Sequence, residues 1–148
     1  MDAAHAGADI FKPIVGRGSA YADIDADGDQ DVVLTQIAGP PLLLGNDVGL
    51  DRHWLPLKLQ STEANRNAIG AWIHARVDGQ DLWRQVMPTR SYLSQSELPV
   101  TIGLGTNATV DLVEVIWPGG RTQSVTPLID QLTVVHDKTG PSLTTASN

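Results

Sequence analysis

The sequence contains no cysteine, which excludes disulfide bonds, thiolate metal sites and a cysteine nucleophile. This absence does not fix the compartment, because exported proteins can also lack cysteine. Aromatic residues make up only 5%, so a core must be built mainly from Val, Leu and Ile. Positive charge is scarce as well: the formal net charge is −7, and an acidic surface repels phosphate backbones. We therefore expect metal cations, and not nucleic acid, as partners.

Long hydrophobic runs are also missing. No apolar stretch approaches the roughly 20 residues needed to cross a bilayer, so we expect no membrane span. The N-terminal stretch Met1 to Asp9 lacks the basic start and the apolar segment of a signal peptide. The chain is therefore either a protein that stays inside the cell or a piece of a longer exported chain.

What is present indicates an all-β protein. Glycine (14) and proline (9) recur too often for long helices. Short β-favouring segments alternate with turns, and about ten short strands at this spacing predict a β-sandwich or a partly closed barrel. The strands that we expect cover residues 31–36, 42–44, 54–60, 71–77, 82–86, 100–105, 110–117, 121–125 and 132–135.

Two of these segments carry local detail. In 71–77 the residues Ala71, Ile73, Ala75 and Val77 alternate with Trp72, His74 and Arg76, which predicts a buried and an exposed face. In 54–60, Pro56 cannot donate to a ladder, which favours a sheet edge or a bulge. Two turns are also expected, a hairpin at Asp78-Gly79 and a type II turn centred on Pro118-Gly119.

The strongest signal is the run DIDADGDQD at residues 23–31, with an aspartate at every second position and one glycine. Calcium collects six to eight oxygens at 2.3–2.6 Å, and a tight loop can aim alternate side chains at it. We expect side-chain oxygens from Asp23, Asp25 and Asp27, the backbone carbonyl of Asp29, and Asp31 to close the shell. The predicted cofactor is Ca²⁺.

Other interpretations of this run are weaker. An EF-hand needs Glu at the twelfth position and flanking helices, whereas Leu34 stands there and the flanks are strand-like. Magnesium prefers to keep water over filling an all-protein cage. A solvated acidic turn does not place aspartate at every ligand position with glycine in register.

The surrounding residues resemble a known repeat. RGSAYA (17–22), the aspartate run, and GPPLLLGND (39–47) look like an FG-GAP/VCBS-type repeat. Such repeats, as in integrin α-chain propellers, hold calcium in a D-x-D-x-D-G-x-x-D loop between strands. The resemblance implies the same ligand roles for the five aspartates and a propeller-blade-like segment at the N-terminal end.

The rest of the chain resembles the ASPIC/UnbV domain, which follows FG-GAP repeats in many bacterial exported proteins and in cartilage acidic protein. The motifs are HWL (53–55), NRNAIGA (65–71), SYLSQS (91–96), IGLG (102–105) and VIWPGGR (115–121). One departure is Pro88-Thr89-Arg90, where the family tends towards glycine. The resemblance implies β-structure and an extracellular or periplasmic location, but no defined activity.

These two resemblances divide the chain. We expect an FG-GAP/VCBS-like segment at 1–50, an ASPIC/UnbV-like β domain at 51–137 and a flexible tail at 138–148. A propeller needs several blades to close, and only one repeat is present. The chain is then expected to be the C-terminal part of a longer exported protein, or a short product of such a gene, with the lone repeat packed on the second segment.

Catalytic signatures are weak. No G-x-S-x-G elbow occurs, Gly16-Arg17-Gly18 has Tyr21 where a dinucleotide fingerprint needs glycine, and the four histidines show no zinc-ligand spacing. His53 and His74 are the only candidates for a general base. We expect His53 to pack at the entry to the second segment and His74 to lie at the surface.

Other polar and aromatic residues have structural explanations. Ser91, Ser94 and Ser96 are expected to form hydrogen bonds within the fold and not to act as nucleophiles. The tryptophans are expected to pack in the core or at an interface, with a carbohydrate platform as the alternative; they are Trp54, Trp72, Trp83 and Trp117.

Two functions are consistent with these sequence features. The first is a calcium-stabilised β-module for adhesion or for recognition of a protein or glycan. The second is a calcium-dependent hydrolase, in which the ion polarises an ester or lactone carbonyl. A shell filled by protein oxygens suits a structural ion better, which favours the first.

Overall fold

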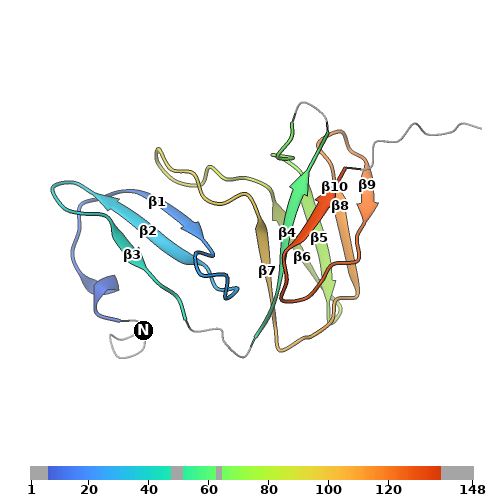
Figure 1. Ribbon diagram of the computed structural model, residues 1–148, viewed down its shortest axis with the longest axis horizontal. Coiled ribbons are helices and arrows are strands. Elements are labelled where there is room, and N and C mark those ends of the chain that lie inside the picture. The colour runs from blue at the N-terminus through green and yellow to red at the C-terminus, as the bar shows by residue number, and fades with distance from the viewer. Residues whose placement is uncertain (1–6, 48–51, 63–64, 138–148) are drawn as a thin grey trace, which may run out of the picture.

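The computed structural model describes residues 7–47, 52–62 and 65–137. This part of the chain contains ten strands and one short 3-10 helix, η1 (Asp9–Phe11) (Figure 1). The prediction of an all-β fold is therefore confirmed, and the sheets do not close into a barrel. The expected tail at 138–148 and the boundary between residues 50 and 51 lie outside the described residues.

Within the described residues, no helix combines the length and the apolar character that a membrane crossing requires.

The N-terminal sheet has three antiparallel strands in the order β1-β2-β3. Their bounds are β1 (Gly16–Ala22), β2 (Asp31–Gln36) and β3 (Leu42–Leu44). Strands β2 and β3 match the segments expected from the sequence. Strand β1 is the strand-like flank that precedes the aspartate run, but it was given no bounds from the sequence, because Gly, Arg and Ser dilute the β-favouring residues in it. Its pairing with β2 brings Ala22 opposite Asp31, so the aspartate run lies where the two strands join.

The remaining strands form two further sheets. One has the order β10-β4-β7, and the other has the order β6-β5-β8-β9. Strand β10 runs parallel to β4, and the other pairs are antiparallel. The bounds are β4 (His53–Gln60), β5 (Trp72–Val77), β6 (Gln80–Gln85), β7 (Val100–Gly105), β8 (Leu112–Ile116), β9 (Thr122–Ser124) and β10 (Thr133–His136).

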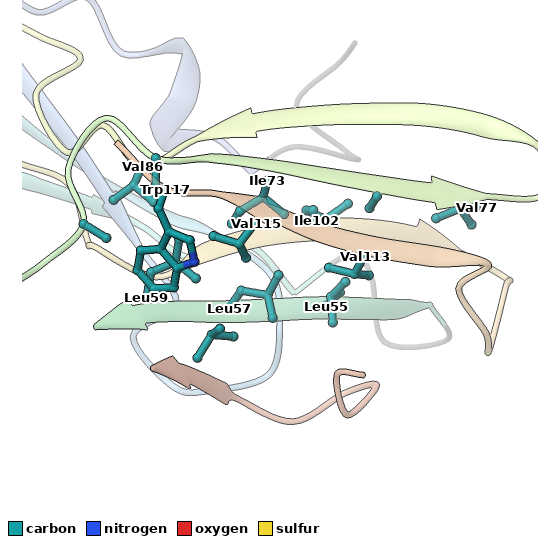
Figure 2. Packing of buried hydrophobic residues seen from close by; sticks show 14 of the residues in the cluster. Leu55, Leu57, Leu59, Ile73, Val77, Val86, Ile102, Val113, Val115 and Trp117 are labelled. Atoms are coloured by element: carbon teal, nitrogen blue, oxygen red, sulfur yellow. The ribbon is translucent and has the colours of Figure 1, made fainter. Parts of the chain in front are cut away.

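The core lies between these two sheets, as in a β-sandwich. Leu55 and Leu57 of β4 face Ile73 of β5 and Val115 of β8 across the gap (Figure 2). All four side chains are fully buried, so they supply much of the apolar area removed from water. The buried face predicted for 71–77 is confirmed: at most 5% of Ala71, Ile73, Ala75 and Val77 is exposed.

Strand β4 corrects one expectation. Pro56 predicted an edge strand or a bulge, but β4 is the central strand of its sheet, and the register shift against β7 falls between His53 and Trp54 and not at Pro56, which is buried. Strand β10 pairs with β4 only from Leu57 onward, so no β10 residue stands beside Pro56. The missing N–H of the proline is tolerated there because one side of the strand has no partner to accept from it.

The two turns behave differently. Asp78 and Gly79 have φ values of +49° and +72°, and Val77 pairs with Gln80, so the predicted two-residue hairpin is confirmed. After β8, the Gly120 N–H donates to the Trp117 carbonyl at 2.8 Å, which closes a turn centred on Pro118 and Gly119. The positive φ, however, belongs to Gly120 (+84°) and not to Gly119, so the predicted type II turn is wrong.

The core packing gives a direct prediction. Leu57→Ala should lower the free energy of unfolding by about 2–5 kcal/mol, because it leaves a cavity between the two sheets. Leu128→Ala is the matched control, since Leu128 is 57% exposed, and should change stability by less than about 0.5 kcal/mol. Urea unfolding followed by circular dichroism measures both. Equal losses in the two variants would contradict the sandwich packing.

Candidate metal centre

The aspartate loop connects β1 to β2 and is shaped by its own backbone hydrogen bonds. The carboxylate of Asp23 accepts from the N–H groups of Asp27 and Gly28, both at 3.1 Å. The backbone takes the left-handed conformation at Ala26 (φ +63°) and Gly28 (φ +95°). These two residues reverse the chain, which lets successive aspartates turn towards the same side of the loop.

Three carboxylates meet in this loop. One oxygen each from Asp23, Asp25 and Asp27 lies within 4.8 Å of the other two. Oxygens that share one calcium ion at 2.3–2.6 Å can be at most about 5 Å apart. The donor set, which is hard oxygen only, also matches what calcium prefers. The three residues predicted to supply side-chain ligands therefore fit a single cation.

The carboxylates in this loop repel one another. Loss of hydration inside the loop, followed by repulsion from the carboxylates of Asp27 and Asp31, raises the pKa of Asp25 above its ordinary value. Hydrogen bonds from backbone N–H groups act in the opposite direction but do not cancel the shift. A divalent cation at the three carboxylates would relieve this repulsion.

Asp31 and Asp29 stand apart from these three. Asp31 is 7% exposed, and its carboxylate accepts from the N–H groups of Ile24 at 3.1 Å and Asn46 at 2.9 Å. It thereby ties the start of the loop to the residues that follow β3. The backbone N–H of Asp29 donates to Asp27 at 2.9 Å. The ligand roles expected for Asp29 and Asp31 stay predictions.

A tryptophan from the sandwich supports the loop. An added Cβ at Gly28 would lie 2.2 Å from ring atoms of Trp54, which is the second residue of β4. No side chain larger than hydrogen fits between the loop and this ring, and the φ of Gly28 independently favours glycine. Trp54 thus packs at an interface, as expected, and it fixes the loop against the first strand of the sandwich.

The segment between β6 and β7 attaches the N-terminal sheet to the sandwich (Figure 1). The N–H groups of Ser19 and Tyr21 donate to the hydroxyls of Ser91 and Ser96, each at 3.2 Å. The Glu97 N–H donates to the Tyr21 carbonyl at 3.1 Å. The serines therefore bond within the fold, as predicted, and they do so along the free edge of β1.

Glu97 is a site residue that was not predicted from the sequence. Its carboxylate accepts from the side-chain amide of Gln30 at 3.0 Å and from the backbone N–H of Asp23. Burial raises the pKa of Glu97, although these two hydrogen bonds oppose the rise. Nothing in the sequence singles out this residue, because its partners are more than sixty positions away.

His53 has an oriented imidazole. Its Nδ1 lies 2.6 Å from Asp130 Oδ2, and the second oxygen of Asp130 accepts from the Trp54 N–H at 3.0 Å. The Trp54 N–H, and next the His53 ring, lower the pKa of the Asp130 carboxyl. The side chain of His53 is 37% exposed, so His53 forms a partly exposed polar pair with Asp130 and does not serve for packing alone.

His74 corrects an expectation. It was expected at the surface, yet it is 8% exposed. Its side chain points to the outer face of the sheet, where cross-strand neighbours cover it: Trp83 stacks on the ring at 4.2 Å, and Asp81 lies 2.7 Å from Nε2. Glu114 lies 3.5 Å from Nδ1 on the other side. His53 and His74 sit in different sheets and do not form a common site.

The tryptophans divide into two groups. Trp117 is 3% exposed and Trp54 is half-buried, as expected for packing residues. Trp72 and Trp83 lie on the outer face of their sheet and are 44% and 48% exposed. Packing within the described residues therefore covers only part of each side chain.

The contact between Gly28 and Trp54 can be tested by substitution. Gly28→Ala should lower the melting temperature, with a cost of about 1–3 kcal/mol from the left-handed backbone and a further loss from the clash with the ring. Gly103→Ala is the control, since an added Cβ there meets nothing within 4 Å. Thermal denaturation compares the two; an unchanged melting temperature for Gly28→Ala would show that the loop does not rest on Trp54.

Comparison with known proteins supports one of the two resemblances. The family model described as ASPIC and UnbV matches residues 61–141. A search of curated proteins finds no match. The match covers more than half of the chain, whereas the FG-GAP/VCBS-type resemblance of the N-terminal segment has no such support. The chain belongs to the ASPIC and UnbV family.

Proposed function

We propose that the chain is a calcium-binding β-module of an exported protein, that the ion is structural, and that the module recognises a protein or glycan partner. The observation that carries the calcium part is the convergence of the Asp23, Asp25 and Asp27 carboxylates within 4.8 Å. The N-terminal segment is, in this proposal, an FG-GAP/VCBS-type repeat. The extracellular or periplasmic location belongs to the same proposal.

A structural role for the ion rests on the position of the loop. The loop joins β1 to β2, packs on Trp54 through Gly28 and contacts Glu97 through Gln30. An ion that draws the three carboxylates together would therefore stiffen a junction between the N-terminal sheet and the sandwich. Binding to the folded state alone stabilises by about 2.7 kcal/mol at a hundredfold excess over the dissociation constant.

Calorimetry and thermal denaturation test the calcium site through one variant, Asp25→Asn. Calcium should raise the melting temperature of the wild type and bind more weakly to the variant, which lacks one anionic ligand. Without calcium, the difference in melting temperature between the wild type and the variant should have the opposite sign. The pKa of Asp25 is raised in the folded protein, so its deprotonation above the ordinary pKa lowers the free energy of unfolding. Asn does not ionise, so without calcium Asp25→Asn should melt at a higher temperature than the wild type at pH 7.

Asp78→Asn is the matched control for this experiment. It makes the same chemical change in the hairpin turn after β5, where φ is +49° and Asn is well tolerated. It should leave calcium binding unchanged. The proposal fails if the wild type takes up no calcium in the titration and its melting temperature ignores the metal.

A second candidate function is a calcium-dependent hydrolase of esters or lactones. The observation that favours it is the 2.6 Å contact between His53 and Asp130, because a carboxylate-oriented imidazole is the arrangement of a general base. Under the first proposal, hydrolysis of ester and lactone substrates stays at the background rate with or without chelator. Hydrolysis that is lost with EDTA and in Asp25→Ala, while the fold persists, would favour the enzyme instead.

A further inference from the structure

A cavity of about 310 Å³ opens between the N-terminal sheet and the sandwich. Tyr21 and Gln30 line it from the first, Arg84 and Thr101 from strands of the second, and Glu97 from the connecting segment. Small-molecule sites begin at about 300 Å³, so the cavity has room for a ligand of monosaccharide size. It is assembled only when the two parts of the chain are docked, which places it at a junction where ligands commonly bind.

The charges around this cavity are unusual for the chain. Arg84 and Arg90 both line it, in a protein with 10 basic and 17 acidic residues. Their guanidinium groups donate to backbone carbonyls: Arg84 to Trp83 at 2.9 Å, and Arg90 to Met87 at 3.1 Å and Gln85 at 3.3 Å. Among residues 7–47, 52–62 and 65–137, neither arginine forms an ion pair with a carboxylate.

Two arginines without acidic partners are suited to an oxyanion. The guanidinium fork donates two parallel hydrogen bonds to a carboxylate, and the strength of such bonds is roughly twice that of neutral ones. A ligand carboxylate would supply an acidic partner for these two arginines, whereas Glu97, the acidic residue of the lining, is held by the amide of Gln30. Inorganic anions satisfy the same charge, but they would leave the rest of the cavity unused.

The rest of the lining is suited to hydroxyl groups and to a C–H face. The phenol of Tyr21, the amide of Gln85 and the hydroxyl of Thr101 can each exchange hydrogen bonds with ligand hydroxyls. Leu98 and Val100 add apolar surface beside them. Glu97, held by the amide of Gln30 at 3.0 Å, can accept from a hydroxyl that lies away from the ligand carboxylate.

We infer that this cavity binds a sugar acid, such as a uronic acid residue of a glycan, with Arg84 and Arg90 on its carboxylate and the other polar lining residues on its hydroxyls. This inference deepens the proposed function, since it takes the glycan as the partner that the module recognises. The two arginines lie outside the aspartate loop, so the carboxylate contacts should form with or without calcium, although Gln30 of the loop also lines the cavity. Failure of calcium binding would therefore leave it standing.

Titration calorimetry with glucuronate, in buffer containing either calcium or EDTA, tests the inference. Wild-type protein should bind glucuronate in both buffers, and glucose and inorganic phosphate at least tenfold more weakly, which is about 1.4 kcal/mol. Arg84→Gln should lose at least tenfold in affinity for glucuronate. Arg84→Lys, which keeps the charge but not the fork, should also bind more weakly than wild type.

Arg66→Gln is the control, because Arg66 is exposed and does not line the cavity. It should bind glucuronate like the wild type, and equal melting temperatures for all variants show that they fold. The inference is overturned if glucuronate does not bind in either buffer, if Arg66→Gln loses as much as Arg84→Gln, or if phosphate or glucose binds as tightly as glucuronate. Calcium uptake without glucuronate binding would overturn the inference and leave the calcium proposal intact.

Discussion

The attachment of β1 to the segment between β6 and β7 is the constraint on which the N-terminal sheet, the aspartate loop and the cavity depend. Within the described residues, the buried hydrophobic core takes none of its members from β1, β2 or β3. The N-terminal sheet therefore has little apolar burial of its own to stabilise it. It is positioned instead by backbone groups of β1 that bond to Ser91, Ser96 and Glu97. Gly18 permits this approach, since an added Cβ would lie 2.3 Å from the Ser94 hydroxyl.

The positions of the aspartate loop and of the cavity both depend on this attachment. Gln30 lines the cavity, and the loop to which it belongs rests on Trp54. Glu97 touches the backbone of Asp23 on one side and faces the cavity on the other. Ion binding in the loop and ligand binding in the cavity would therefore involve the same few residues. Such shared contacts are the physical route by which one site can bias another.

Sequence reasoning succeeded where the signal is local. Alternation in 71–77 gave the buried face, and the spacing of Asp23, Asp25 and Asp27 marked three carboxylates that lie within 4.8 Å of one another, while their role as ligands stays a proposal. It failed where distant residues decide. Strand β1 forms because of its partners and not its composition, His74 is covered by residues of two neighbouring strands, and Glu97 meets the loop across 67 positions. No local pattern reports these contacts, because each is set by how the sheets pair.

The parallel pairing of β10 with β4 has a consequence for how the protein is made. Thr133 lies beside Leu57, so β4, the first strand of the sandwich, cannot pair with β10 until almost all of the described chain has left the ribosome. During that interval the edge of β4 that later pairs with β10 has backbone N–H and C=O groups without a strand partner. Exposed strands of this kind recruit other chains, and late closure of long-range pairs slows folding. Until β10 pairs with it, this edge of β4 is therefore open to pairing with a strand of another chain.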